Sequence, residues 1–194
     1  ARCFGNFAAA LLHHDKTAPL PFETMAGVVT ATFEKDDNVT VNLTNPHSMQ
    51  LFVLNADPTV GADVHFLNTG VPHAVAFLDK LEGLDISRLG AYLRYHEAFS
   101  PKGTNANFAR ILSPGHIAIR TYERGVEDET LACGTGMTAC ALLHAVLTDA
   151  PSPIQVDVAG GDTLKVGFQR TGDRFTDVTL TGPADLVFTG DIQI

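Results

Sequence analysis

Two short segments of the chain are apolar on almost every side of a helix. Residues 4–14 read FGNFAAALLHH, and residues 139–147 read ACALLHAVL. Helices that are apolar all round usually pack inside a protein rather than on its surface. The pattern therefore predicts two buried helices.

Each predicted helix is followed by the same order of features. A proline-containing turn comes first, then an extended run that ends in Ala-Gly, and then two segments in which apolar and polar residues alternate. Alternation around a turn rich in Gly, Asn or Asp predicts a β-hairpin. The agreement in order and length favours an internal repeat over chance similarity. The predicted strand pairs are Val29–Phe33 with Val39–Leu43, and Leu164–Phe168 with Val178–Leu180.

The stretch between the two copies predicts strands and one helix. Leu51–Leu54 and Ala74–Phe77 are strand-like, and His116–Tyr122 alternates as a strand does. Ile86–Tyr95 has helical spacing of its apolar residues. A sheet with several hairpins and few helices is typical of α+β proteins rather than of wound β-α-β folds. We therefore predict the α+β class.

Charge and composition exclude several classes of protein. The 194 residues include 22 acidic and 13 basic side chains, a net charge of -9. Such a surface repels phosphate, so no nucleic-acid partner is expected. No run of about 18 apolar residues could span a bilayer, and no secretory signal pattern is present, so we expect no membrane partner. Three cysteines make no disulfide framework, which favours reduced thiols and a cytoplasmic location.

Residues 122–140, YERGVEDETLACGTGMTAC, carry the most chemistry. The CGTG sequence at 133–136 opens the second apolar helix, where backbone N–H groups can face an anion such as a carboxylate. A thiol at this place is expected to have a lowered pKa and to act as a base or nucleophile. For Cys133 we prefer this role. For Cys3 and Cys140 we prefer the alternative of a small buried hydrophobe.

Other polar positions leave two interpretations open from the residues alone. Glu123 and Arg124 end a predicted strand, where they are either solvated or part of a site. His73 follows a tight polar turn, a place where sites occur, although a solvent-facing turn is an equal alternative. Asn105 and Asn107 suit a zwitterionic ligand, or only a turn. The histidines have no ligand spacing with cysteine, so no metal site is predicted, and no P-loop lysine follows the glycines.

Together these motifs resemble the diaminopimelate epimerase family over nearly the whole chain. That family interconverts LL- and meso-2,6-diaminopimelate without pyridoxal phosphate. The resemblance therefore implies a cofactor-independent amino-acid epimerase of lysine and peptidoglycan precursor biosynthesis, acting on a small molecule. The block Glu123–Gly136 is the most specific part. The supporting segments are Ala1–Phe4, Phe22–Gly27, Asn68–His73, Gly103–Phe108 and Asp185–Ile194.

The resemblance also implies a fold of two pseudo-symmetric lobes, each a curled, mostly antiparallel sheet around a central helix. Residues 1–46 would be a partial N-terminal lobe, 47–183 the C-terminal lobe, and 184–194 a strand returning to the N-terminal lobe. The first helix lacks the unit that precedes the second, so we expect several tens of residues upstream of Ala1. The resemblance is compatible with a homodimer.

In this family two cysteines act from opposite faces of the substrate. One thiolate removes the α-proton and the other thiol donates a proton, so the configuration inverts. Cys133 matches one of these acid/bases. The grip on the distal centre would select diaminopimelate over ordinary amino acids. The other matched residues are Gly134 and Thr135 at the reacting carboxylate, Glu123 and His73 near the reacting amino group, and Arg124 and Asn105 at the distal L-centre.

The sequence departs from the family pattern at two places. Val71 stands where the family often has an asparagine that contacts the substrate. The partner cysteine belongs to a Cys-Gly-Asn-Gly stretch directly before Ala-Arg-Cys, and Cys3 is the later cysteine of that motif. We therefore expect this chain to lack one acid/base and to be inactive alone. The alternatives are a related racemase or isomerase of the same fold acting on another amino acid, and a non-catalytic amino-acid-binding remnant.

Overall fold

The computed structural model describes residues 1–24, 27–34, 38–185 and 190. The helices are α1 (Arg2–Leu11), α2 (Ile86–Arg94) and α3 (Gly134–Thr148), with a 3-10 turn η1 (Glu97–Phe99). The strands are β1 (Leu20–Thr24), β2 (Gly27–Phe33), β3 (Val39–Asn42), β4 (His47–Asp57), β5 (Ala62–Asn68), β6 (Pro72–Phe77), β7 (Asn105–Ser113), β8 (His116–Glu123), β9 (Asp128–Thr130), β10 (Ile154–Asp157), β11 (Thr163–Thr171) and β12 (Arg174–Gly182).

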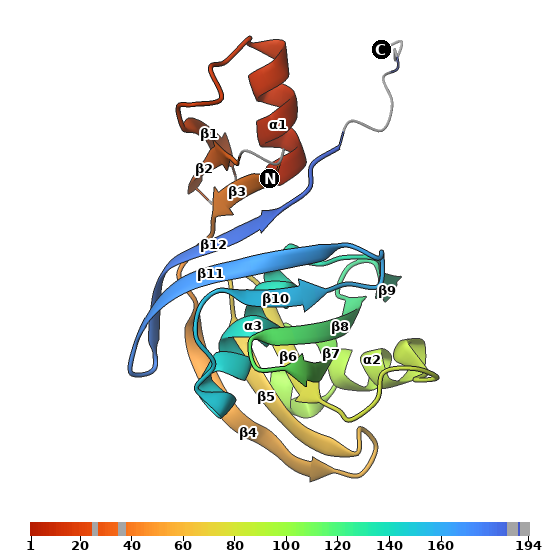
Figure 1. The fold of residues 1–194 in the computed structure, drawn as a ribbon. Coiled ribbons are helices and arrows are strands. Elements are labelled where there is room, and N and C mark those ends of the chain that lie inside the picture. Colours follow the sequence, from red (N-terminus) through yellow and green to blue (C-terminus); the bar gives the residue numbers. More distant parts are fainter. Residues whose placement is uncertain (25–26, 35–37, 186–189, 191–194) are drawn as a thin grey trace.

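These strands form one mixed sheet in the order β1-β2-β3-β12-β11-β10-β8-β7-β6-β5-β4, with β9 beside β8. The sheet curls so that α3 lies inside it (Figure 1). Two neighbouring pairs, β6–β7 and β8–β10, are parallel, and each is joined through a helix. The remaining pairs within the described residues are antiparallel. The predicted α+β class is confirmed, although it contains two local β-α-β units.

Both predicted hairpins are present. β2 pairs with β3 and β11 pairs with β12, so each copy of the repeat is a helix followed by three strands. The two copies meet where β3 and β12 pair antiparallel. At this seam the hydroxyl oxygens of Thr40 and Thr181 are 2.7 Å apart. Residues 35–37 of the first predicted turn lie outside the described residues.

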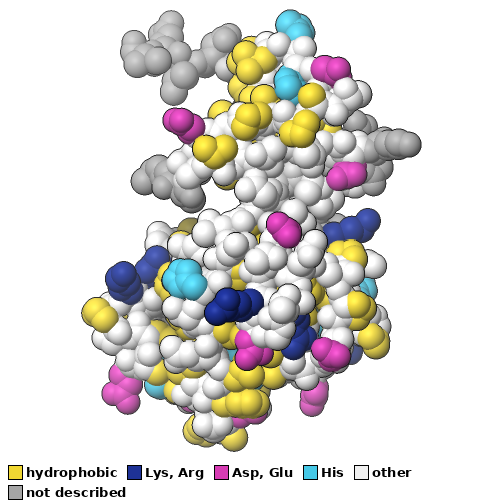
Figure 2. All heavy atoms as spheres, turned by 90° about the vertical axis from the view of Figure 1, so that its left-hand side faces the viewer, with side chains coloured by type: hydrophobic (Ala, Val, Ile, Leu, Met, Phe, Trp, Pro, Cys, Tyr) yellow, Lys and Arg dark blue, Asp and Glu magenta, His cyan; other side chains and the backbone are white. Residues whose placement is uncertain are grey.

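The two helices of the repeat differ in burial. α3 contacts strands on both sides of the curl, and its residues from Gly136 to Ala145 are buried. In α1 only Gly5 and Ala9 are buried, because among the described elements α1 packs mainly against β1–β3. Hydrophobic side chains consequently lie at the surface of the upper part of the molecule, which contains α1 (Figure 2). The prediction of a buried first helix is wrong, and Cys3, expected to be buried, is exposed.

The chain after β12 runs along α1. Arg2 Nη1 donates to the carbonyl of Pro183 and Asn6 Nδ2 donates to that of Ala184, both at 2.7 Å. Most of the predicted returning strand at 184–194 lies outside the described residues, and the predicted domain boundaries stay predictions.

Helix α2 approaches the end of β8 closely. A Cβ at Gly90 would collide with the Tyr122 side chain, so a glycine is required at this contact. The Asp85 side chain accepts a hydrogen bond from the Arg88 N–H and so caps the helix. This packing fixes the strand end that carries Glu123. In the part of the chain that the structure describes, no helix is long and apolar enough to cross a membrane.

Candidate active site

The polar turn before β6 is attached to the start of α3. Thr69 Oγ1 donates to the carbonyl of Thr135 at 2.9 Å. The Asn68 side chain accepts from the Gly70 N–H at 3.0 Å, which stabilises the turn. Gly70 has φ of 103°, a conformation that favours glycine. The turn therefore brings the beginning of β6, and with it His73, next to the first turn of α3.

Cys133 is the N-cap residue of α3, as the CGTG sequence predicted. Its side chain is 7% exposed, and its Sγ lies 3.5 Å from Thr135 Oγ1. Burial raises the pKa of the Cys133 thiol, although hydrogen bonds from Thr135 and from the Gly136 amide oppose the rise. The negative charge of Glu123 acts in the same direction as burial. The expectation of a lowered pKa at Cys133 is wrong, because the loss of hydration outweighs the donors at the helix start.

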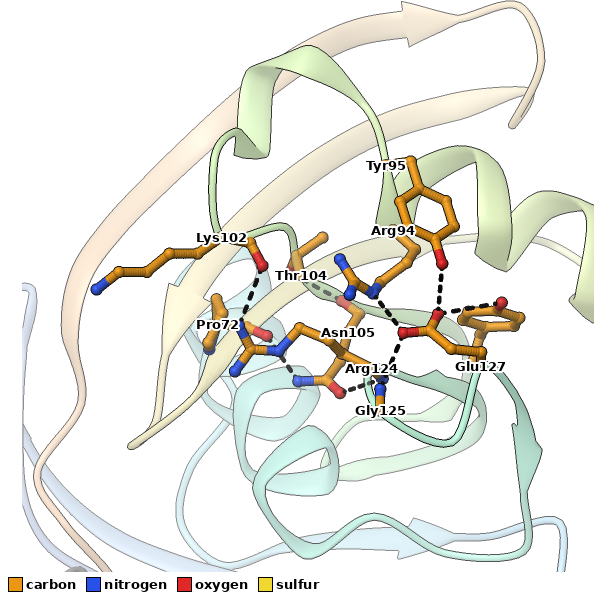
Figure 3. A network of polar contacts seen from close by, with 10 residues as sticks. Pro72, Arg94, Tyr95, Lys102, Thr104, Asn105, Arg124, Gly125 and Glu127 are labelled. Atoms are coloured by element: carbon orange, nitrogen blue, oxygen red, sulfur yellow. Dashed lines mark hydrogen bonds and ion pairs between the residues drawn. The ribbon is translucent and has the colours of Figure 1, made fainter.

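Asn105 connects the strands that carry the other predicted residues. Its Oδ1 accepts from the Arg124 N–H at 2.9 Å, and its Nδ2 donates to the Pro72 carbonyl at 2.8 Å. The Arg124 guanidinium donates to the Lys102 carbonyl at 3.1 Å. Figure 3 shows Asn105 between Pro72 and Arg124. Because His73 is also the direct register partner of Asn105, three of the predicted residues lie together at the ends of β6, β7 and β8.

Glu123 lies at the end of β8, near Cys133. Its Oε2 accepts from Thr130 Oγ1 at 3.0 Å, and its charge contributes to the raised pKa of the Cys133 thiol. Gly134 is the first helical residue of α3, and a Cβ there would come within 3.1 Å of Leu180. The predicted residues thus form two neighbouring groups. One group is Cys133, Gly134, Thr135 and Glu123, and the other is His73, Asn105 and Arg124.

A network around Glu127, which we did not predict, holds the turn after β8 (Figure 3). The carboxylate accepts from Arg94 Nε, Tyr95 Oη and the Gly125 N–H, each at 3.1 Å. These bonds, above all the one from the Gly125 amide, hold the pKa of Glu127 below its ordinary value. The Arg94 side chain in turn lies against Gly103, where a Cβ would collide with it. Glu127 therefore ties the turn that carries Arg124 to the segment that leads into Asn105.

His73 is fully buried at the start of β6. Asn107 Nδ2 lies 3.1 Å from its Nδ1. Burial, and then the positive charge of Arg124, lower the pKa of His73 to about 3, so the ring is neutral at pH 7. The alternative of a solvent-facing histidine in this turn is therefore wrong.

Two cavities adjoin these groups and share Gly70 in their walls. The larger, of about 760 Å³, is bounded by Ala1 and Phe4 of the first repeat copy and by Thr135 of the second. The smaller, of about 410 Å³, is bounded by Arg124 and by the 98–103 segment. Val71 lies in the wall of the larger cavity. The first turn of α1 and that of α3 thus line one space, and the positive potential at the start of α3 favours an anion there.

The described residues contain no group of three or more His, Cys, Asp or Glu side chains that could hold a metal ion. The groups that the site presents are a protonated thiol at a helix start, the backbone amides of the first helical turn, a carboxylate, an arginine and a neutral imidazole.

Comparison with known proteins identifies relatives of the chain. Residues 65–187 match the sequence profile of the family described as Diaminopimelate epimerase. The chain is 40% identical over 195 residues to the diaminopimelate epimerase of Hydrogenobaculum sp., covering 98% of this chain and 67% of the relative. It is 42% identical over 174 residues to that of Aquifex aeolicus, covering 89% and 61%. The chain thus spans about two thirds or less of the length of these relatives.

Solved structures with low sequence identity share the fold. A probable proline racemase from Agrobacterium radiobacter has a TM-score of 0.62 at 21% identity, covering 86% of this chain and 57% of its own. A phenazine biosynthesis protein from Bacillus anthracis has a TM-score of 0.66 at 12% identity, covering 92% of this chain and 70% of its own. At these identities the likeness concerns the fold alone.

Proposed function

Because the chain belongs to the diaminopimelate epimerase family, we propose that it contributes the Cys133 half of a site that interconverts LL- and meso-2,6-diaminopimelate. The observation that carries this proposal is the pair of cavities that meet at Gly70. Diaminopimelate has an amino-acid group at each end. The larger cavity adjoins the α3 start and suits the reacting end, and the smaller adjoins Arg124 and suits the distal end.

At the reacting end, the amides of Gly134 and Thr135 would bind the carboxylate. Removing the α-proton places negative charge on the α-carbon and its carboxylate, and helix-start N–H donors stabilise that charge. Glu123 lies near enough to Cys133 to influence its charge, and a carboxylate there also attracts the substrate ammonium. Because the pKa of Cys133 is raised, its resting form is the thiol, which makes it the proton donor in one direction of the reaction.

At the distal end, Arg124 supplies a positive charge in the wall of the smaller cavity. Asn105 already bonds the Arg124 amide and the Pro72 carbonyl through its side chain. Its main contribution is therefore to hold Arg124 and β6 in register, with one Nδ2 hydrogen and one Oδ1 lone pair left for a ligand. A site that binds a second charged end discriminates against amino acids with apolar side chains. Such ligands would leave the polar groups of the distal site without hydrogen-bond partners, which is unfavourable.

The proposed inversion needs a second acid/base on the opposite face of the α-carbon. Cys140 is fully buried inside α3, and Cys3 is exposed on α1, so we assign neither to this role. We therefore also propose a mechanism that uses two cysteines and no pyridoxal phosphate, in which these 194 residues alone do not epimerise diaminopimelate. The cytoplasmic location and the homodimer stay predictions.

The test is the exchange of the α-proton of diaminopimelate in deuterated water, followed by NMR. We expect exchange with inversion, and hence epimerisation, in a form extended at the N-terminus to include a Cys-Gly-Asn-Gly stretch, and epimerisation slower by about 10²–10⁴-fold in its Cys133→Ser variant. The 194-residue chain should show no epimerisation. Rapid epimerisation by the 194 residues, or full activity of the Cys133→Ser variant, would contradict the mechanism.

The same preparations separate the two alternatives. Exchange of another amino acid in preference to diaminopimelate would indicate a related racemase or isomerase. Calorimetry that detects diaminopimelate binding in the extended form without any exchange would indicate a non-catalytic binding protein.

A further inference from the structure

The orientation of the Asn107 side-chain amide is determined by its neighbours. Asn107 Nδ2 lies 2.9 Å from the carbonyl oxygen of Ala74, which can only accept a hydrogen bond. Its Oδ1 accepts from Thr121 Oγ1 at 3.0 Å. Asn107 and Thr121 are both buried, so neither group can turn toward water instead. The nitrogen of Asn107 therefore faces β6, and the oxygen faces β8.

This orientation determines the tautomer of His73. The second hydrogen of Asn107 Nδ2 points to His73 Nδ1, 3.1 Å away. Nδ1 must then be the acceptor, and a neutral ring carries its hydrogen on Nε2. The charge state follows from burial and from Arg124, the cation that acts on this ring, since both lower the pKa of His73.

The Nε2–H group of His73 is buried and has no hydrogen-bond partner among the described residues. Unpaired buried donors are rare and unfavourable, and they often mark a functional site. Asn107 also lies directly against α3, where a Cβ at Gly136 would collide with Asn107 Oδ1. Pro72 and Val71, the residues directly before His73, line the smaller and the larger cavity respectively, so His73 follows directly on the walls of both.

We propose that Asn107 is a positioning residue that fixes His73 as a neutral Nε2–H donor, and that the bound amino acid supplies the acceptor. The inference rests on the proposed function for the identity of that ligand. A donor at Nε2 cannot take a hydrogen bond from an ammonium group and cannot act as a general base. His73 therefore binds a carboxylate oxygen or an unprotonated amine nitrogen, and the proton transfers fall to the cysteines.

The primary test needs no substitution. Nitrogen-15 NMR of the histidine rings in the 194-residue chain at pH 7 distinguishes the two neutral tautomers and the imidazolium. We expect His73 to have its hydrogen on Nε2. His65 serves as an internal reference, because its Nδ1 accepts the Phe52 N–H at 3.2 Å, which predicts the same tautomer without Asn107. A His73 that is protonated on Nδ1, or is an imidazolium at pH 7, would overturn the proposal.

Two variants separate positioning from a purely structural role. Asn107→Asp replaces the donor by an acceptor, so we expect the hydrogen of His73 to move to Nδ1, or the ring to become an imidazolium, while His65 is unchanged. Thr121→Val removes only the donor to Oδ1, and we expect His73 to keep the Nε2–H form because Ala74 still orients the amide. An unaltered tautomer in a folded Asn107→Asp protein, or an altered one in Thr121→Val, would overturn the proposal.

Ligand addition identifies the acceptor. Pimelate has the two carboxylates of diaminopimelate but no amines. If pimelate and diaminopimelate both shift the His73 Nε2–H resonance, the acceptor is a carboxylate oxygen, and if only diaminopimelate does, it is an amine nitrogen. Saturating binding that shifts neither would refute the ligand contact. The tautomer measurement does not depend on turnover, so the Nε2–H form of His73 together with an inactive N-terminally extended protein would count against the proposed function alone.

Discussion

The two apolar helices of the repeat have similar sequences but different surroundings. α3 is enclosed by the curl of the sheet, and Leu142 and Leu143 are 0% exposed. Among the described residues, α1 is covered mainly by β1–β3, and Leu11 and the following Leu12 are 65% and 67% exposed. Apolar composition therefore indicates that burial of a segment is favourable, whereas the amount of sheet around the segment decides how much of it is buried.

The largest expected effect concerns the cysteines near the starts of the two helices. Cys133→Ser should lower the epimerase rate of the N-terminally extended protein by about 10²–10⁴-fold, because a hydroxyl is far less acidic than a thiol and acid/base groups contribute about this much. Cys3→Ser, the matched change on exposed α1, should leave the rate nearly unchanged. Steady-state kinetics on both variants measure the difference. An equal loss of rate in the two variants would contradict the assignment of the acid/base role to Cys133 rather than to Cys3.

The next effect is on stability. Leu142→Ala creates a cavity inside the curl and should lower the free energy of unfolding by about 2–5 kcal/mol. Leu11→Ala removes an exposed side chain and should change it by less than about 0.5 kcal/mol. Urea denaturation of the 194-residue chain measures both values. A comparable loss for Leu11→Ala would mean that α1 is covered in solution.

The enclosed region should also make stability depend on pH. Unfolded His73 takes up a proton near its ordinary pKa of 6.5, whereas folded His73 does so only near about 3, so the unfolded state binds more protons between these values. The contribution is present above pH 6.5 and is lost progressively as the pH falls toward 3. We expect a loss of about 2 kcal/mol between pH 6.5 and pH 5.

Denaturation at several pH values measures this dependence. Buried His65 and His144 also have lowered pKa values and act in the same direction. The His73→Gln variant should therefore show a smaller, not a zero, dependence. An unchanged slope in that variant would contradict the assigned burial of the His73 ring.

The smallest effect concerns the turn after β8, which Glu127 holds. Glu127→Gln keeps the shape of the side chain but removes the charge that Arg94 pairs with, and should lower the free energy of unfolding by about 1 kcal/mol. In the N-terminally extended protein it should also raise the KM for diaminopimelate several-fold, because the turn that Glu127 holds carries Arg124. Glu82→Gln, at the exposed ion pair with Arg110, is the control and should alter neither quantity measurably. A KM effect as large for Glu82→Gln would contradict the role of the Glu127 network.

The sequence predicts well those features that depend on neighbouring residues. The hairpins follow from alternation, and the start of α3 at Cys133 follows from the CGTG sequence. Other features depend on residues distant in the chain. The exposure of α1 depends on how many strands reach it, and the pKa of Cys133 depends on burial by the whole curl.

Glu127 shows why some positioning residues cannot be predicted from the sequence. It lies among other acidic residues, and only its backbone φ of 61° and its contacts with α2 distinguish it. The sequence identifies Asn107 as one of two amides at a strand start. It does not predict the partners of Asn107, because Ala74 and Thr121 belong to other strands. The contact of Asn105 with Arg124 agrees with the shared distal site that the resemblance implies, whereas His73, expected beside Glu123, is the register partner of Asn105. The roles of all these residues with substrate stay proposals.

The pairing of β3 with β12 has a mechanical consequence. In the described part of the sheet, four residue pairs, from Asn42 with Thr179 to Val39 with Gly182, join the two copies, and the Leu43 N–H donates to the Val178 carbonyl beside them. Neighbouring strands such as β11 and β12 are joined by longer ladders. If the walls of the larger cavity draw together around a guest, the two repeat copies will turn relative to each other about this ladder, because it is the place where the sheet passes from one copy to the other.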